Sequence, residues 1–303
     1  MARGYPGNVI FCNNVIGAGE MAVLSTIEWT DATWNPVRGC TKISPGCAHC
    51  YASTFSERFR GVPGHPFEQG FDLRLVPEKL FEPLRWSRPK RIFVNSMSDL
   101  FHDGISSAYI EGVLAVMADT PWHTYQILTK RAERLSELST TVLKQVSTVE
   151  HIWWGVSVEN KKHGLRRIDL LRDSDVRNRF LSIEPLLEDL GRIDLEGIGW
   201  VIVGGESGHG ARPMSADWVR ALRDQCSDAG VPFFFKQWGG VQKKRAGRLL
   251  DGRLHDEMPP KGMCSVPTAS LRSYTIKALS ERIKMMGQAS LVQLPTQDGV
   301  LFR

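Results

Sequence analysis

Short apolar runs recur along the chain, and each ends in small or polar residues and is followed by a helix-like stretch. The clearest helix-like patterns cover Ala108–Met117 and Trp218–Arg223. Apolar strands that alternate with helices are typical of a parallel sheet covered by helices. The pattern predicts strands at Ile27–Thr33, Ile92–Asn95, Thr124–Thr129, Ile152–Val158, Phe180–Ile183, Trp200–Val203 and Pro232–Phe235.

Six or seven such units over about 210 residues indicate an α/β fold, a full or partial (β/α) barrel, rather than a small Rossmann domain. We expect this barrel to occupy residues 25–262. We expect residues 1–24 to be a disordered leader, with Met21 as the natural start of the protein. Residues 263–303 are predicted to form a C-terminal appendage with one helix at about Leu271–Met286.

Polar, charged or glycine residues follow the predicted strands. Connections between parallel strands are right-handed almost without exception, so the carboxyl ends of all the strands open on one face. Loops are polar in most proteins, but the regularity of this arrangement favours an active site at the open end of a barrel. The residues concerned are Asn95–Asp103, Lys130, Arg131, Glu159, Asn160, Glu184, Gly204–Gly208 and Lys236.

The composition is that of a globular protein, with 42% hydrophobic and 23% charged residues. The formal net charge of +5 is a mild basic bias, which permits an anionic partner without requiring one. No apolar run approaches the roughly 20 residues needed to span a bilayer. We therefore expect a cytoplasmic protein with no membrane partner.

Three of the six cysteines form a cluster with the spacing C-x6-C-x2-C, at Cys40, Cys47 and Cys50. A disulfide would leave the third cysteine without a partner, and the clustering fits a reducing compartment better than a disulfide framework. Zinc would use all three thiolates and needs a fourth ligand. An iron–sulfur cluster on three thiolates would leave one iron open to a small molecule.

The zinc and iron–sulfur hypotheses lead to different functions, and the residues alone leave both hypotheses open. A zinc site would suit a zinc-stapled nucleic-acid-binding protein without catalysis, and a cluster that binds no small molecule would suit a non-catalytic iron–sulfur sensor. A structural zinc site usually pairs two ligand knuckles, and this sequence has no second knuckle. The candidates for a fourth zinc ligand are His49, His102, Cys226 and Cys264.

A longer stretch around the cysteines carries a family resemblance. Glu28–Pro36 runs into Gly39-Cys40, and Pro45–Ala52 follows. These motifs resemble a phage-associated branch of the radical S-adenosylmethionine superfamily with no assigned substrate, and the resemblance extends over about Thr26 to Pro259. The usual spacing in the superfamily is C-x3-C-x2-C, and the longer first spacing here includes the turn-forming pair Pro45-Gly46.

The resemblance implies a [4Fe-4S] cluster on Cys40, Cys47 and Cys50, with S-adenosylmethionine on the open iron. One electron from the reduced cluster would cleave S-adenosylmethionine to a 5′-deoxyadenosyl radical, which abstracts hydrogen from the substrate. The cofactor supplies this chemistry and the protein supplies orientation and a water-excluded site. The partners implied are an electron donor such as flavodoxin or ferredoxin and, from the basic residues near the mouth, a nucleic-acid or other anionic substrate.

The resemblance also implies, by position, which residues hold S-adenosylmethionine. Residues after the second strand would contact the methionine amino group, and those after the fourth strand the ribose or a carboxylate. Lys130 would neutralise the methionine carboxylate or an anionic substrate, and glycines after the sixth strand would let the backbone approach a ligand. Each position also has a structural alternative, such as a helix cap at Asp99. The residues are Asn95, Ser96, Ser98, Asp99, Lys130, Ser157, Glu159, Asn160, Glu184, Gly204 and Gly205.

Overall fold

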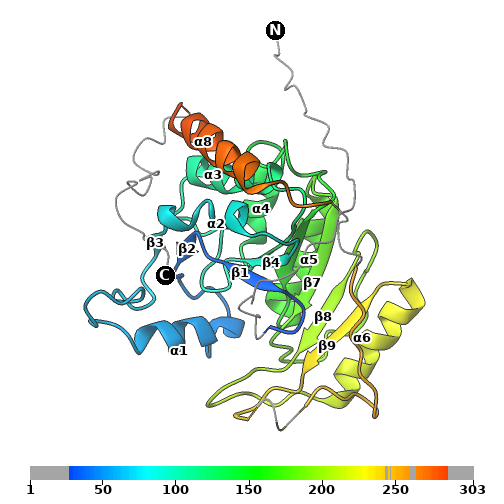
Figure 1. Cartoon of the computed structure of the whole chain (residues 1–303). Helices are drawn as coiled ribbons and strands as arrows, with labels where there is room; N and C mark the ends of the chain where they lie inside the picture. The colour runs from blue at the N-terminus through cyan, green and yellow to red at the C-terminus, as the bar shows by residue number, and fades with distance from the viewer. Residues whose placement is uncertain (1–26, 243–244, 246, 260–263, 286–303) are drawn as a thin grey trace.

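A curled sheet of seven parallel strands lies at the centre of the structure (Figure 1). The computed structural model describes residues 27–242, 245, 247–259 and 264–285, so the expected leader, residues 1–24, lies outside the described residues. The strands pair in chain order, with β1 and β9 at the two edges. They are β1 (Ala32–Trp34), β4 (Arg91–Val94), β5 (Thr124–Thr129), β6 (Ile152–Ser157), β7 (Asn178–Ile183), β8 (Val201–Gly204) and β9 (Phe233–Gln237).

The arrangement confirms the predicted α/β class, and the barrel is partial. All six pairings within the sheet are parallel, from β1 with β4 through to β8 with β9. Helices connect several of these strands, and α5 and α6 pack against the sheet. Parallel strands in one sheet place their carboxyl ends along the same rim. The residues that follow the strands are therefore neighbours in space.

The prediction for the first strand was wrong at its start. Ile27–Thr33 was expected to be extended, but the strand begins only at Ala32. The backbone N–H of Thr30 donates to the carbonyl of Ile27, which closes a turn, and the Thr30 hydroxyl donates to the carbonyls of Ala32 and Arg91. The apolar residues before Ala32 therefore serve the core from a turn rather than from a strand.

Successive side chains along the strands contribute alternately to two separate hydrophobic cores. In β4, Ile92 and Val94 belong to the large core, whereas Phe93 belongs to a smaller core. Successive strand residues point to opposite faces of a sheet, so the smaller core lies on the other face. It is largely aromatic, and its buried members are Trp29, Phe93, Phe180, Trp200, Ile202 and Phe234.

The helices begin and end at residues suited to those positions. The Ser106 hydroxyl caps α3 by accepting a hydrogen bond from the Tyr109 N–H, and α6 lies between a Ser215 cap and Gly230, whose φ is 65°. The α-helices are α1 (Tyr51–Glu57), α2 (Glu82–Arg85), α3 (Ser107–Ala118), α4 (Ala132–Ser139), α5 (Arg166–Asp173), α6 (Ala216–Ala229) and α8 (Ala269–Met285). The remaining turns of helix are η1 (Pro45–Cys47), η2 (Pro77–Lys79) and η3 (Lys161–Leu165).

The C-terminal helix confirms the helical prediction at about Leu271–Met286. Helix α8 lies beside α2 and α3 (Figure 1), and its Leu279 and Ile283 side chains are buried. Arg282 also forms an ion pair with Asp119 at 3.6 Å. Within the described ranges, no helix is both long and apolar enough to cross a membrane.

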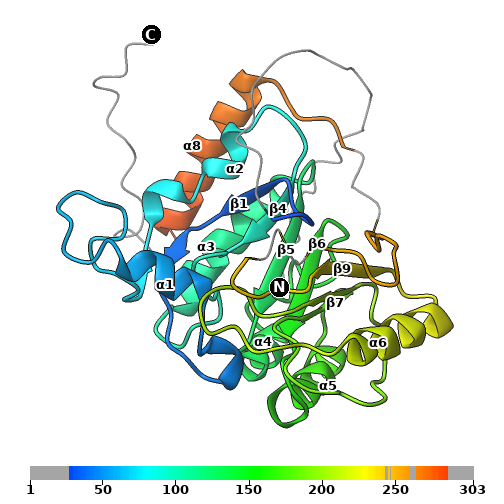
Figure 2. The same ribbon diagram turned by 90° about the horizontal axis from the view of Figure 1, so that it is seen from below.

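The cysteine loop and α1 form an excursion between two short antiparallel strands, β2 (Val37–Arg38) and β3 (Arg74–Leu75). Strand β2 follows β1 after only two residues, so this pair anchors the excursion beside the edge of the sheet. Figure 2 shows α1 near β1 in the view from below. The isolated bridge between Gly39 and Ser98 ties the start of the cysteine loop to the segment after β4.

Candidate cofactor site

Two neighbouring cavities occur at the carboxyl end of the sheet. The smaller, of about 150 Å³, is lined by Cys40, Cys47 and Cys50. The larger, of about 500 Å³, lies over the ends of the middle strands and reaches Glu184 and Gln237. Six residues line both cavities, so the two spaces adjoin each other. These shared residues are Cys50, Tyr51, Phe93, Leu128, Lys130 and Ser157.

The structure brings most of the predicted site residues to these cavities. Three of them lie outside the lining: Glu159, Asn160 and Gly204. Asn160 instead caps η3, its side chain accepting a hydrogen bond from the His163 N–H. The predicted residues that line one or both cavities are Asn95, Ser96, Ser98, Asp99, Lys130, Ser157, Glu184 and Gly205.

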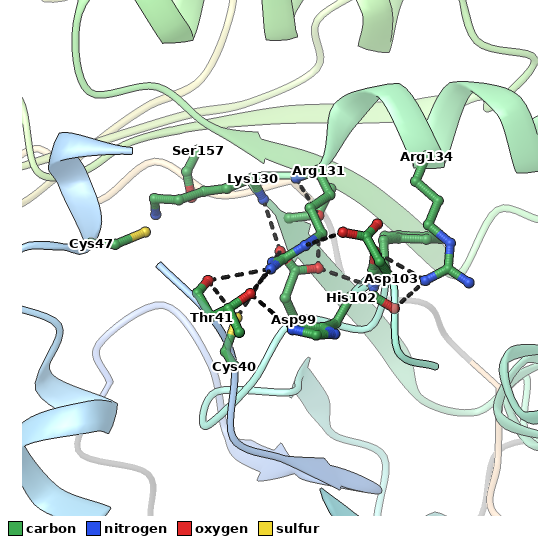
Figure 3. Close-up of polar contacts among 12 residues, drawn as sticks. Cys40, Thr41, Cys47, Asp99, His102, Asp103, Lys130, Arg131, Arg134 and Ser157 are labelled. Atoms are coloured by element: carbon green, nitrogen blue, oxygen red, sulfur yellow. Dashed lines mark hydrogen bonds and ion pairs between the residues drawn. The ribbon is translucent and has the colours of Figure 1, made fainter. Parts of the chain in front are cut away.

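Arg131 holds the first cysteine of the loop (Figure 3). Its Nη1 atom lies 3.4 Å from Cys40 Sγ and 3.2 Å from Asp99 Oδ2. Its Nη2 atom donates to the hydroxyl and the carbonyl of Thr41, at 2.9 and 3.2 Å. Only 6% of the Arg131 side chain is exposed, so these contacts are made in a desolvated environment. They join the cysteine loop to the ends of β4 and β5.

Asp99 organises the same corner through both carboxylate oxygens. Oδ1 accepts from the Thr129 hydroxyl at 2.7 Å and from the Phe101 N–H at 3.0 Å, and Oδ2 accepts from the Lys130 N–H at 3.1 Å. Burial and then the nearby Asp99 charge raise the pKa of the Cys40 thiol, and Arg131 acts in the opposite direction. The described cysteines are free thiols.

The residues after β4 partly serve to hold the neighbouring chain. The Ser98 hydroxyl donates to the Val37 carbonyl at 2.8 Å, and the Tyr51 hydroxyl donates to the Ser96 carbonyl at 2.5 Å. Asn95 has a φ of 60° and accepts a hydrogen bond from the Val37 N–H through Oδ1. This end of β4 is thus bound to β2 and to α1, the elements on either side of the cysteine loop.

The middle of the cysteine loop rests on two further ion pairs. Glu159 is fully buried and pairs with Arg167 at 2.5 Å. A Cβ at Gly46 would lie 3.2 Å from the Glu159 side chain, so the loop packs directly on this carboxylate. On its other side, Arg212 donates to the Pro45 carbonyl at 2.8 Å while it pairs with Glu206. These contacts restrain Pro45-Gly46, which lies in the longer first spacing.

A fourth ion pair lies in the wall of the larger cavity. Lys236 Nζ contacts both Glu184 oxygens, at 2.7 and 2.8 Å, and this bond joins β9 to the residue after β7. Both side chains are mostly buried. Gln237 Nε2 donates to the Ser207 hydroxyl at 2.5 Å and so connects the same wall to the loop after β8. The wall of this cavity therefore contains charged and hydrogen-bonded side chains.

Four residues of the cavity lining carry a buried polar atom with no hydrogen-bond partner. They are Asn95 at Nδ2, Trp29 at Nε1, Arg131 at Nε and Gln237 at Oε1. Buried polar groups are satisfied in most native structures, so such atoms are candidates for contact with a ligand. Three soft thiol donors beside these groups fit an iron–sulfur cluster and a polar ligand next to it. No three His, Cys, Asp or Glu side chains of the described residues are grouped so as to hold a single metal ion.

The candidates for a fourth zinc ligand lie in different places. Cys226 is buried in α6, within the large core, and burial raises its pKa to about 12. His102 contacts Thr41 through Nε2 at 3.0 Å, beside Cys40. His49 lines the larger cavity rather than the smaller one. Cys264 packs against the large core and lines neither cavity.

Gly204, the last residue of β8, and Gly205, which follows it, differ in what surrounds them, and this leads to a prediction. A Cβ at Gly205 would lie 2.0 Å from the Trp238 carbonyl oxygen, whereas one at Gly204 would lie 3.3 Å from the Glu184 side chain. Backbone cannot yield as a side chain does, so Gly205→Ala is expected to destabilise the fold by about 3 kcal/mol. Gly204→Ala is the matched control, expected to cost below about 1 kcal/mol. Urea denaturation measures the loss of stability in both variants. Equal losses would contradict the interpretation that the backbone at Trp238 excludes a Cβ at Gly205.

Comparison with known families identifies the chain. The family described as "Protein of unknown function (DUF5131)" matches residues 24–259. The chain belongs to the DUF5131 family. The match covers nearly the stretch, about Thr26 to Pro259, that carries the resemblance described above, and it includes both cavities and the cysteine loop.

The fold is also similar to two solved structures. One is a spore photoproduct lyase variant with bound AdoMet and a dinucleoside spore photoproduct, with 11% identity and a TM-score of 0.36. That match covers 64% of this chain and 60% of the lyase, so the chain spans less than two thirds of that protein. The other is N-acetylneuraminate lyase from Mycoplasma synoviae, with 11% identity, a TM-score of 0.34, and coverage of 72% of this chain and 73% of that chain. No curated protein sequence matches this chain.

Several residues of the site had no assigned role from the sequence. Arg131 was noted after its strand only as a basic residue near the mouth, and Glu206 only within the run Gly204–Gly208. Arg167 and Arg212 were not singled out at all. Arg167 follows Glu159 by eight residues, on the helix after the same strand, which is the only signal that could have suggested the pair. Arg212 lies in an irregular loop, where no pattern in the sequence predicts its contact with Pro45.

Proposed function

We propose that this protein is a radical S-adenosylmethionine enzyme of the phage-associated branch that its motifs resemble. One observation carries the proposal: the three clustered cysteines line a small cavity that adjoins a larger one at the carboxyl end of a parallel partial barrel. Active sites on such barrels lie at this end. The two volumes suit a cluster and an organic cofactor placed side by side.

The arrangement of the thiols supports an iron–sulfur cluster over zinc. Zinc would need four ligands at about 2.0 to 2.3 Å from one point. The thiolates of a cluster each bind a different iron, so they stand around a larger object. Cys40, Cys47 and Cys50 line a cavity of about 150 Å³, a space that suits a cluster better than a single ion.

The larger cavity provides suitable partners for S-adenosylmethionine. Lys130 and Ser157 line both cavities and would hold the polar groups nearest the cluster. Trp29 and Phe93 offer aromatic surface, and Tyr51 borders both spaces. Bound there, the cluster would supply the electron that cleaves S-adenosylmethionine into methionine and a 5′-deoxyadenosyl radical, which takes a hydrogen atom from the substrate.

The substrate we propose is a nucleic acid or another anion. Lys42 and Lys130 line the cavities, and the net charge of the chain is +5. Lys236 contributes less to this argument, because Glu184 neutralises it at 2.7 Å. We also propose an electron-donor protein such as flavodoxin or ferredoxin as a partner, since the cluster would need one electron per turnover.

Anaerobic metal analysis tests the proposal against its alternatives. Reconstituted wild-type protein is expected to hold about four irons and four sulfides, and to bind S-adenosylmethionine in equilibrium dialysis. One zinc per chain in place of iron would favour the zinc-stapled binding protein. A full cluster without binding of S-adenosylmethionine would favour the sensor. Each of these two results would contradict the proposal.

A further inference from the structure

We propose that Arg131 sets the reduction potential of the cluster through its hydrogen bond to Cys40, an inference that rests on the proposed function. The other contacts of Arg131 position it for this role. Asp99 and Thr41 hold the guanidinium on either side, so that Nη1 stays 3.4 Å from Cys40 Sγ. Figure 3 shows the guanidinium between Asp99 and the Cys40-Thr41 segment.

The direction in which Arg131 shifts the reduction potential follows from its positive charge. Reduction adds one negative charge to the cluster, and hydrogen bonds to the ligand sulfurs are among the factors that set its potential. A cation that donates to a ligand sulfur stabilises the reduced form more than the oxidised form. The Arg131 side chain is 6% exposed, so water screens this interaction little. Arg131 therefore raises the reduction potential and makes the cluster easier to reduce.

Cys40 and Cys47 differ in the group that contacts their sulfur. The neighbour of Cys47 is the neutral hydroxyl of Ser44, at 3.8 Å from Sγ. A charge-assisted hydrogen bond is roughly twice as strong as a neutral one. The protein therefore acts more strongly on the electron distribution of the cluster through Cys40 than through Cys47.

Asp99 limits the effect and also complicates a simple test. Its carboxylate lies 3.2 Å from Arg131 and offsets part of the positive charge. Removal of Arg131 alone would leave this carboxylate buried without its partner, which is strongly destabilising. The informative comparison is therefore between Asp99→Asn and the double variant Asp99→Asn/Arg131→Met, because neither contains the unpaired carboxylate and the two differ only in whether a guanidinium faces Cys40.

The experiment is a redox titration of anaerobically reconstituted protein, followed by the electron paramagnetic resonance signal of the reduced cluster, without S-adenosylmethionine. The double variant is expected to have a more negative midpoint potential than Asp99→Asn, by at least a tenfold change in the reduction equilibrium, or about 59 mV for one electron. Arg131→Lys in the wild-type background keeps the charge but loses the fork geometry, so a smaller negative shift from wild type is expected.

Arg134→Gln is the matched control. Arg134 lies on α4, the helix that begins directly after Arg131, and donates to the carbonyls of Phe101 and Ile105 without contacting a cysteine. The Arg134→Gln substitution removes a nearby positive charge but no hydrogen bond to sulfur. The reduction equilibrium of the cluster should therefore change by well below tenfold. A shift as large as that of the double variant would overturn the assignment to the hydrogen bond.

The outcomes separate the two hypotheses. Wild-type protein without a cluster would overturn the proposed function. A cluster in all variants with one common midpoint potential would overturn the role of Arg131 and leave the proposed function intact. If the double variant loses its iron, Arg131→Lys decides the matter, because an unchanged potential in that variant overturns the inference and a negative shift supports it.

Discussion

Arg167→Met is expected to lower the free energy of unfolding by about 3 to 5 kcal/mol, because it leaves a buried carboxylate without its partner. Glu159 is 0% exposed and Arg167 Nη1 lies 2.5 Å from its Oε2 atom. The same guanidinium donates to the Ser157 carbonyl at 2.9 Å, at the end of β6. Urea denaturation of the apoprotein measures the loss without any contribution from a cofactor.

The double variant Glu159→Gln/Arg167→Met is the control for this prediction. It removes both charges, so it should recover a large part of the stability lost in Arg167→Met. Gly46 packs against Glu159, so the single variant should also lose support for the cysteine loop and retain less iron on reconstitution. If the double variant proves no more stable than Arg167→Met, the loss does not arise from a stranded carboxylate.

Stability is expected to fall by about 2 kcal/mol between pH 7 and pH 4.5 because of His123. Burial lowers the pKa of His123 to about 4, while the Pro83 carbonyl acts in the opposite direction. The unfolded chain takes up a proton at its ordinary pKa of about 6.5, and the folded chain does not until about pH 4. The contribution of the neutral imidazole is therefore fully present above about pH 6.5 and is lost as the pH falls towards 4.

His123→Gln isolates this titration. His123 is 0% exposed, accepts from the Lys90 N–H through Nδ1 and contacts the Pro83 carbonyl through Nε2, and a glutamine can replace part of these contacts without titrating. Urea midpoints at several pH values should show a shallower decline for the variant than for the wild type. Parallel curves for the two proteins would assign the acid sensitivity to other groups.

The strands of this fold could be predicted from the sequence because buried parallel strands leave continuous apolar runs. Val201–Gly204 and Phe233–Gln237 lie close to the runs that predicted them. The first strand was placed too early, because Ile27 and Trp29 are apolar for another reason. Both pack in or against the small aromatic core, which they reach from a turn. Apolar character indicates burial, and it does not by itself distinguish a strand from a turn.

The candidate site could be predicted only to the level of its strand ends. Lys130 directly follows β5 and Ser157 ends the neighbouring strand β6, and both residues line both cavities. Glu159, although it follows the same strand as Ser157, turns into the protein and pairs with Arg167. Contacts such as Arg131 with Cys40 join residues 91 positions apart, and no local pattern records them. Strand order gives the neighbourhood, whereas side-chain pairing requires the three-dimensional structure.

The most direct test of the central claim is cleavage of S-adenosylmethionine by the reconstituted protein under anaerobic conditions with a strong reductant. We expect the wild type to form 5′-deoxyadenosine and methionine, and the triple variant Cys40→Ala/Cys47→Ala/Cys50→Ala to form neither. Chromatography of the quenched reaction measures both products. A folded wild-type protein that holds its iron and sulfide and yet forms no 5′-deoxyadenosine would contradict the account.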